Sequence, residues 1–178
     1  MKKTIIIILV ILGLLICGIL LFNMNVEVEY VPEEEIADTD LRKTMITLYF
    51  QNAESKELQK ESRLIDSKEL LLDPYVELLN MLMNGPENES LEKLIPDGTK
   101  ILGVELKGNC LNINFSKEFI ENFKESEKEK KNTIYSIVNT LTELTEINSI
   151  KILVEGEERD DFKDIGLDFS MEISREKN

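Results

Sequence analysis

Histidine and tryptophan are absent from this 178-residue chain, and cysteine occurs only twice. Without histidine, the chain has neither a Ser-His or Cys-His pair for nucleophilic catalysis nor an imidazole ligand for zinc. We expect no disulfide between Cys17 and Cys110, because Cys17 lies inside a long apolar run that such a bond would disrupt. The composition therefore excludes His-based enzymes, imidazole zinc sites and a disulfide-stabilised scaffold.

Other signatures of chemistry are missing as well. The eight glycines are assigned to predicted turns and to the apolar run, so no glycine-rich phosphate loop is present. Carboxylate clusters at 33–35 and 160–161 are expected by chance among 35 acidic residues, and both lie in predicted loops. Residues 157–161 lack the alternating acidic pattern of a calcium loop, since Arg159 interrupts them. We expect no catalytic residues, no bound metal and no cofactor.

Basic residues are outnumbered by acidic ones, 21 to 35, which makes the formal net charge −14. Lys2 and Lys3 are the only charges in residues 1–23, so the remainder carries 19 basic and 35 acidic residues. A domain this acidic repels phosphate backbones and anionic lipid headgroups. We therefore expect no nucleic-acid partner, and we expect the domain to be held away from the surface of a bilayer rather than to lie on it.

One long apolar run does occur, at residues 5–22. As a helix its 18 uncharged residues span about 27 Å, close to a hydrocarbon core of roughly 30 Å. Lys2 and Lys3 precede the run and acidic residues follow it, which places the N-terminus inside. Residues 1–23 are thus predicted to be a cytoplasmic start and a single transmembrane helix, with the following domain extracytoplasmic on the cell membrane.

There are two alternatives to an uncleaved helix. A cleaved signal peptide needs a shorter apolar core and small residues before the cut, whereas the first alanine is Ala37. Lipidation at Cys17 would make the protein a lipoprotein, but Ile16 rather than a small residue precedes the cysteine, and the apolar run continues beyond it. The pattern favours the spanning helix, with a lipoprotein anchored at Cys17 as the main alternative.

Residues 24–43 have no helical period and contain seven acidic residues together with Pro32. A like-charged run with proline predicts an extended linker, which could reach about 70 Å when stretched. It serves either as a plain tether or as a stalk that sets the height of the domain above the membrane.

Residues 44–174 carry the patterns of a folded domain, followed by a tail at 175–178. Alternation predicts strands at 45–51, 150–154 and, at a sheet edge, 167–173, and residues 62–65 are a second short strand candidate. A hairpin is predicted around Gly108-Asn109, with three apolar pairs on one face. These pairs are Leu106 with Leu111, Val104 with Ile113, and Leu102 with Phe115. The same register places Cys110 on the outer face, where no neighbour in sequence would activate its thiol.

Helical patterns alternate with these strands. Asp73 is a predicted N-cap before Pro74, and Gly85-Pro86 ends that helix with a left-handed glycine cap. Apolar residues spaced three and four apart predict a second helix at 132–144. Shorter helical turns are predicted at 90–95 and after Ser116, which would cap one of them, and a turn at 96–99. The order predicts an α+β fold: a two-layer sandwich with two main helices on one face of a mostly antiparallel sheet.

Taken together, these segments resemble the GerM domain of sporulation and spore germination proteins. The resemblance covers residues 45–156, and the tail through Ile173 looks similar. It rests on the order and spacing of six segments rather than on one motif. These segments are 47–50, 78–86 (with Asn84-Gly85-Pro86), 94–100 (with Pro96-Asp97-Gly98-Thr99), 111–119, 137–143 and 150–156.

The resemblance implies a non-catalytic extracytoplasmic module of the bacterial envelope, with no catalytic residues to transfer. Family members are membrane- or lipid-anchored, and some support a ring-like complex around the developing spore. This chain differs in having one such domain and no good lipidation motif at Cys17. The expected partners are other envelope or membrane proteins, including those of a ring-like or oligomeric assembly.

Three functions follow from these patterns. The first is protein–protein interaction, with an exposed sheet edge, the final strand or the face of Thr47 and Tyr49 as candidate surfaces. The second is recognition of peptidoglycan, which the 6% aromatic content disfavours because glycan sites stack sugars on aromatic rings. The third, a wall hydrolase, would need two carboxylates fixed across a cleft.

Overall fold

The structure, a computed structural model, describes residues 42–123 and 126–175. The apolar run predicted to span the membrane, 5–22, lies outside these residues, as does the predicted linker up to residue 41. Within the described ranges, no helix is long and apolar enough to cross a bilayer.

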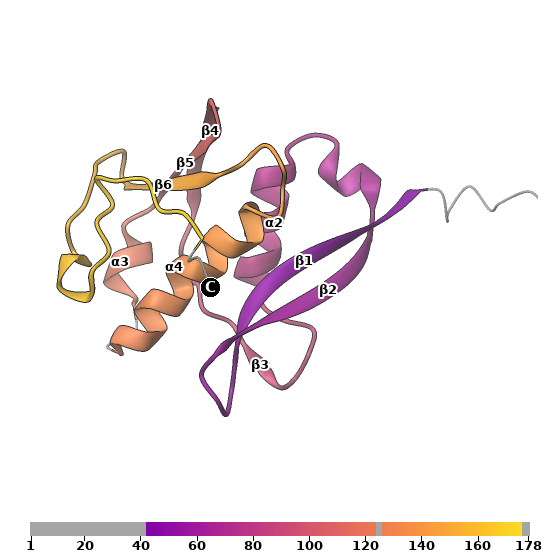
Figure 1. The fold of residues 1–178 in the computed structure, drawn as a ribbon, viewed down its shortest axis with the longest axis horizontal. Coiled ribbons are helices and arrows are strands. Elements are labelled where there is room, and N and C mark those ends of the chain that lie inside the picture. Colours follow the sequence, from indigo (N-terminus) through magenta and orange to yellow (C-terminus); the bar gives the residue numbers. More distant parts are fainter. Residues whose placement is uncertain (1–41, 124–125, 176–178) are drawn as a thin grey trace, which may run out of the picture. The chain divides into compact units, whose positions relative to one another are not determined.

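The first sheet is built on a long hairpin of β1 (Lys43–Asn52) and β2 (Leu58–Asp66), which pair antiparallel over nine residue pairs (Figure 1). The predicted strand at 45–51 is confirmed, and Ile46, Leu48 and Phe50 are buried as the alternation requires. The strand predicted at 62–65 begins earlier, because β1 provides ladder partners along the whole of β2.

A third strand, β3 (Leu91–Glu92), pairs with the end of β1 and completes the order β2-β1-β3. The prediction of helical turns at 90–95 is therefore wrong. Leu91 is buried and lies opposite Asn52, and the N–H of Ala53 donates to the carbonyl of Ser90 at 2.9 Å. Pairing with an existing strand outweighs a short helix whose nucleation is unfavourable.

The second sheet contains β4 (Ile101–Lys107), β5 (Cys110–Phe115) and β6 (Ser149–Val154), in the order β4-β5-β6. Two of the predicted hairpin pairs are confirmed, Leu106 with Leu111 and Val104 with Ile113. The third is wrong, since a bulge between Ile101 and Gly103 places Ile101 opposite Phe115 and leaves Leu102 49% exposed. A bulge inserts one residue, which reverses the faces of those beyond it.

The same sheet is mixed rather than antiparallel, because β5 and β6 run parallel. The connection between them contains α4 (Glu127–Leu141) and returns the chain to the end of the sheet at which β5 began. Parallel neighbours require such a crossover, usually a helix. The predicted single sheet is thus two three-stranded sheets, whereas the predicted α+β class is confirmed.

The two main helices form where the sequence predicts them, with different ends. The helix α2 (Pro74–Asn84) begins at Asp73, whose carboxylate accepts the N–H of Val76 at 3.0 Å. It ends at Gly85, whose φ of +96° and ψ of 178° differ from the predicted left-handed cap. The second helix, α4, begins at Glu127 and ends at Leu141, one turn or so before the predicted end at residue 144.

The helical turn predicted after Ser116 is α3 (Glu118–Glu121), but Ser116 does not cap it. The Ser116 hydroxyl oxygen instead accepts the backbone N–H of Lys100 at 3.0 Å, which ties the start of β4 to the end of β5. The turn predicted at 96–99 is confirmed, with the N–H of Thr99 donating to the carbonyl of Pro96 at 3.3 Å.

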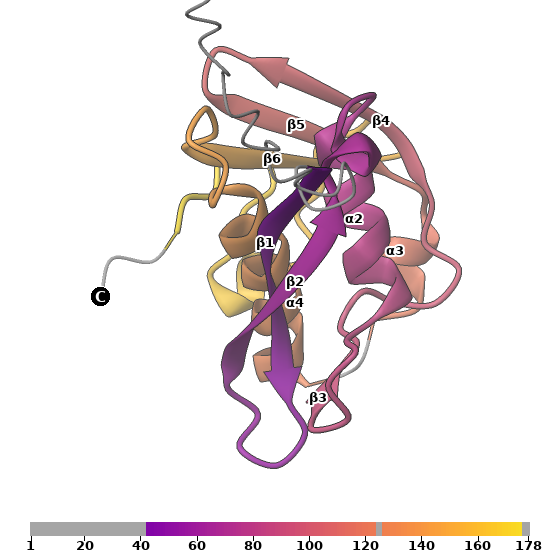
Figure 2. The same ribbon diagram turned by 90° about the vertical axis from the view of Figure 1, so that its right-hand side faces the viewer.

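One hydrophobic core joins both sheets and both main helices. Figure 2 shows α2 and α4 next to the hairpin of β1 and β2. The helix α2 contacts α4, β1 and β4, and α4 also contacts β1. The strand predicted at 167–173 does not form: only Ile173 bridges Ile150 of β6. Leu167, Phe169 and Ile173 are still buried, so this segment follows the core as an irregular chain.

Candidate interaction site

Asp160 and Asp161, one of the two carboxylate clusters of the sequence, are paired locally, whereas residues 33–35 lie outside the described residues. Asp161 accepts from Arg159 Nε at 2.8 Å, and Asp160 lies 3.6 Å from Lys163 Nζ. The hydrogen bond from Arg159 holds the pKa of Asp161 below its usual value. Among the residues that the structure describes, no group of carboxylates and cysteines is arranged to hold a metal ion. These carboxylates are therefore charges of an exposed loop.

Cys110 lies at the start of β5 with only 8% of its surface exposed. It borders a shallow depression of about 370 Å³ whose rim includes Lys107, Lys151 and Glu172. Burial, reinforced by the nearby Glu172 carboxylate, raises the pKa of the thiol despite a hydrogen bond with Ser149. The thiol is thus protonated at neutral pH, in agreement with the unreactive cysteine expected from the sequence.

A network of hydrogen bonds surrounds Tyr49, in the middle of β1. Its backbone N–H donates to Thr140 Oγ1 at 3.1 Å, and its carbonyl accepts from Ser136 Oγ at 2.5 Å. Two hydroxyls of α4 thus take the place of a neighbouring strand at this point of β1. The Tyr49 hydroxyl donates to Glu143 Oε1 at 2.7 Å, and the residue is only 7% exposed.

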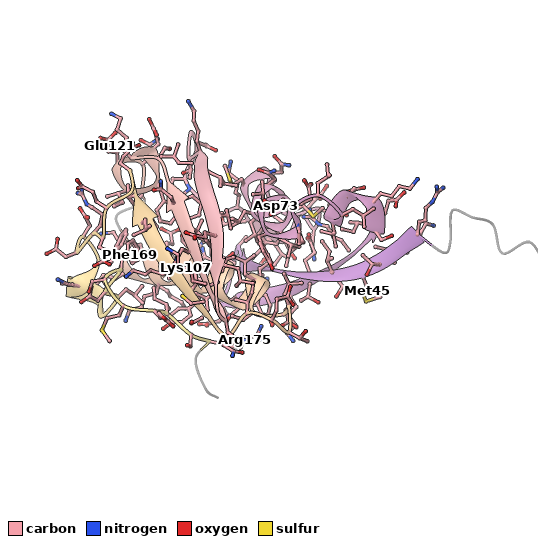
Figure 3. All side chains as sticks on the ribbon, turned by 90° about the horizontal axis from the view of Figure 1, so that it is seen from above. Met45, Asp73, Lys107, Glu121, Phe169 and Arg175 are labelled. Carbon is pink, nitrogen blue, oxygen red and sulfur yellow. The ribbon has the colours of Figure 1, made fainter. Side chains whose placement is uncertain are left out.

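Arg175 closes this arrangement from the far end of the chain. Its guanidinium donates to the carbonyl of Asn139 at 2.6 Å and to Glu143 Oε1 at 2.9 Å. It also lies 5.6 Å from the centre of the Tyr49 ring. Figure 3 shows Arg175 at the edge of the domain, near the point where the described chain ends. Burial would raise the pKa of Glu143, but Tyr49 and Arg175 outweigh it and hold that pKa below the usual value.

Three of these residues, Tyr49, Asn139 and Arg175, line a groove of about 420 Å³ between β1, β2 and α4, which we call the Tyr49 groove. Its lining is polar, and Asn139 Oδ1 is buried there without a hydrogen-bond partner among the described residues. The groove is thus a polar surface whose side chains can donate and accept hydrogen bonds. Its lining residues are Tyr49, Glu57, Leu58, Lys60, Asn132, Tyr135, Asn139 and Arg175.

The sequence predicted part of this site. Thr47 and Tyr49 were candidates for a contact face, and the structure places both beside α4; Tyr49, however, is engaged by the protein itself. The final strand, the other candidate surface, does not form. Sequence reasoning missed Ser136, Thr140 and Arg175. The spacing of the two hydroxyl residues, one helical turn apart beside apolar positions, was the available signal.

Residues 47–160 match the Germane family, described as "Sporulation and spore germination". The match covers well over half of the chain, so the chain belongs to this family of GerM-like domains. A search of the curated proteins found no match.

Solved structures share the fold. The tandem GerMN domains of the sporulation protein GerM from Bacillus subtilis are 20% identical with a TM-score of 0.61, covering 76% of this chain and 47% of theirs. The first GerMN domain of that protein is 22% identical with a TM-score of 0.60, covering 74% of this chain and 98% of its own. A putative lipoprotein from Clostridium perfringens is 28% identical with a TM-score of 0.51, covering 78% and 92%. This chain therefore spans about half the length of the tandem structure.

Proposed function

We propose that this protein is a membrane-anchored, extracytoplasmic interaction module of the bacterial envelope that acts in sporulation or spore germination without catalysing a reaction. The observation that carries the proposal is membership of the Germane family over residues 47–160. The described residues are consistent with a binding role, because they present a polar groove and strand edges. Its partners are other envelope proteins, including members of a ring-like or oligomeric assembly.

A pull-down from membranes tests this role. The full chain carrying a C-terminal tag is crosslinked in sporulating and in vegetative cells, and recovered proteins are compared by mass spectrometry. We expect specific envelope proteins, enriched in the sporulating sample. Recovery of no stable partner in either state would contradict the proposal.

For its location we propose a single membrane span at residues 5–22, with the domain outside. The N-terminal lysines and the length of the apolar run support this placement. The second candidate is a lipid anchor at Cys17, supported by the likeness to the putative lipoprotein from Clostridium perfringens. Labelling with a palmitate analogue separates the two, because only a lipoprotein would incorporate the label and lose it in Cys17→Ser.

Binding of peptidoglycan is the second candidate function. The Tyr49 groove favours it, since its polar lining, which includes two tyrosines and two asparagines, suits a ligand rich in hydroxyl and amide groups. Sedimentation with purified peptidoglycan tests it. Enrichment in the pellet that is lost in Asn139→Leu would support this function, and no enrichment would exclude it.

A further inference from the structure

The domain leaves several strand edges without a neighbouring strand, and most of these edges are protected. The free edge of β2 carries the charged residues Lys60, Glu61 and Arg63, and the edge of β4 is interrupted by the bulge at Ile101 and Gly103. Charges and bulges are the usual devices that prevent an edge from pairing with another chain. Ile173 bridges the outer edge of β6.

The second edge of β1 is covered along only part of its length. At one end β3 pairs with Gln51 and Asn52, and in the middle Thr140 and Ser136 bind the N–H and carbonyl of Tyr49. In an antiparallel ladder, peptide groups point to the two sides alternately. The N–H and carbonyl groups of Tyr49 point away from β2, so the same groups of Thr47 and Met45 do so as well. Among the described residues, neither Thr47 nor Met45 has a backbone hydrogen-bond partner on that side.

The edge is open there because α4 ends at Leu141, beside this part of β1. A pocket of about 170 Å³ lies between the exposed edge and the end of the helix. Ile46, Leu78 and Leu144 supply apolar walls, so one aliphatic side chain fits. Met45, 71% exposed, lies at the start of the edge (Figure 3). Met45 and Thr47 are themselves uncharged, whereas Lys43 precedes them on the same side of β1.

The charged residue in the lining of the pocket is acidic, and within the domain it pairs with Arg175. The C-terminal end of α4 carries the negative end of the helix dipole and no basic residue in its last turn. Glu143 lines the pocket, and Glu146 follows a few residues later. Arg175 shows that a guanidinium binds at this end of the helix, since it donates to the carbonyl of Asn139 and to Glu143.

We propose that the edge of β1 at Met45–Thr47 binds an extended segment of a partner protein as an added strand. Backbone hydrogen bonds to Met45 and Thr47 provide affinity. An aliphatic side chain of that segment enters the pocket of Ile46, Leu78 and Leu144, and a lysine or arginine two residues away lies near Glu143. The inference rests on the proposed interaction role and names the surface and the chemistry of the partner.

Two synthetic peptides test the site on the full chain in nanodiscs. The probe is acetyl-Thr-Lys-Thr-Leu-Thr-Val-Thr-amide, and the matched control carries Glu in place of Lys. Binding is measured by fluorescence anisotropy, and amide exchange is followed by mass spectrometry. We expect the Lys peptide to bind about tenfold more tightly than the Glu peptide, and to slow exchange over residues 45–47.

Two matched variants locate the contact. Thr47→Pro removes an outward N–H of β1, and Ser62→Pro removes an outward N–H of β2, so neither loses a hydrogen bond of the β1–β2 ladder. We expect Thr47→Pro to weaken binding at least tenfold and Ser62→Pro to leave it within about twofold. If Thr47→Pro does not fold, the test uses instead a peptide probe that is N-methylated next to its Leu. This probe lacks a backbone donor and should bind at least tenfold more weakly than the unmethylated probe.

Three results would overturn the site: equal affinity for both peptides, equal effects of the two proline variants, or slow exchange at Met45 and Thr47 before peptide is added. The last would mean that this chain or a second copy already covers the edge. The pull-down separates the two proposals. Recovery of partners by Thr47→Pro as well as by the unaltered chain would remove the site and keep the function, whereas recovery by neither would remove the function.

Discussion

Glu61 shows how a single charged residue connects distant parts of the chain. Its side chain, 9% exposed, accepts the N–H groups of Glu87 and Asn88 at 3.0 and 2.9 Å and binds Arg63 at 2.5 Å. Arg63 in turn donates to the carbonyl of Gly85 at 2.8 Å. The pair thus joins β2 to the loop that leaves α2. The sequence around Glu61 contains Arg63 but gives no sign of the backbone partners of the pair, which lie more than 20 residues away.

Replacement of this carboxylate should destabilise the domain in a way that depends on pH. Burial alone would raise the pKa of Glu61, but the two N–H donors and Arg63 together lower it. A lowered pKa means that the stabilisation is present at neutral pH and is lost as the pH falls through the folded-state value. We expect Glu61→Gln to lower the free energy of unfolding by about 1–3 kcal/mol at pH 7, measured by urea unfolding, and by less at pH 3.

The exposed neighbour Glu87 provides the control for this measurement. Its side chain is 77% exposed, so Glu87→Gln should change the free energy of unfolding by less than about 0.5 kcal/mol. An equal loss in Glu61→Gln at both pH values would show that the carboxylate charge is not responsible.

Cys110 provides a second test at this scale. Since burial raises the pKa of its thiol, alkylation of the folded Cys17→Ser protein by iodoacetamide at pH 7 should be about tenfold slower than in denaturant. The folded-state rate should rise with pH. Equally fast labelling in the folded and denatured protein would contradict the buried, protonated thiol.

At the scale of elements, helix and strand ends depend on individual backbone conformations. Gly85 ends α2 with φ +96° and ψ 178°, a region open essentially to glycine alone. A Cβ there would lie 3.4 Å from Lys93 Cβ. We expect Gly85→Ala to lower the free energy of unfolding by about 1–3 kcal/mol. Thermal unfolding followed by circular dichroism measures this effect.

Gly103 is the matched control, because its φ is not positive and an added Cβ would meet no atom within 4 Å. Gly103→Ala should therefore change stability by less than about 0.5 kcal/mol. Similar losses at both positions would show that the backbone conformation of Gly85 is not what the protein requires.

At the scale of the whole molecule, five phenylalanines tie the C-terminal segment to the core without a strand. Their rings form a continuous chain with centroid distances of 4.4, 5.2, 4.8 and 4.9 Å. The rings belong to Phe115, Phe119, Phe123, Phe162 and Phe169. Alternation at 167–173 correctly indicated that Leu167, Phe169 and Ile173 are buried, but Met171 is 65% exposed and the predicted strand does not form. Leu167, Phe169 and Ile173 pack in the core although their segment forms no complete ladder of strand hydrogen bonds.

Loss of one ring from this chain should loosen the segment. Phe162 is 2% exposed and contacts rings on both sides, so Phe162→Ala should lower the free energy of unfolding by about 3–5 kcal/mol. Hydrogen exchange should rise most in residues 160–175. Met171→Ala, at a 65% exposed position, is the control and should have little effect. Equal effects of the two substitutions would contradict this role of the rings.

Local sequence was sufficient for the elements whose signals are short-range. Asp73-Pro74 and Gly85-Pro86 delimit α2 because caps and proline act within one helical turn, and Gly108-Asn109 sets the register of its hairpin up to the bulge. The lack of histidine, the excess of acidic residues and the ordered segments that resemble the GerM domain needed no coordinates. Tertiary structure alone decided the split into two sheets, the parallel β5–β6 pair and the position of Arg175 on Glu143. It also decided how far α4 covers β1, because hydrogen bonds between residues some 90 positions apart leave no local pattern in a single sequence.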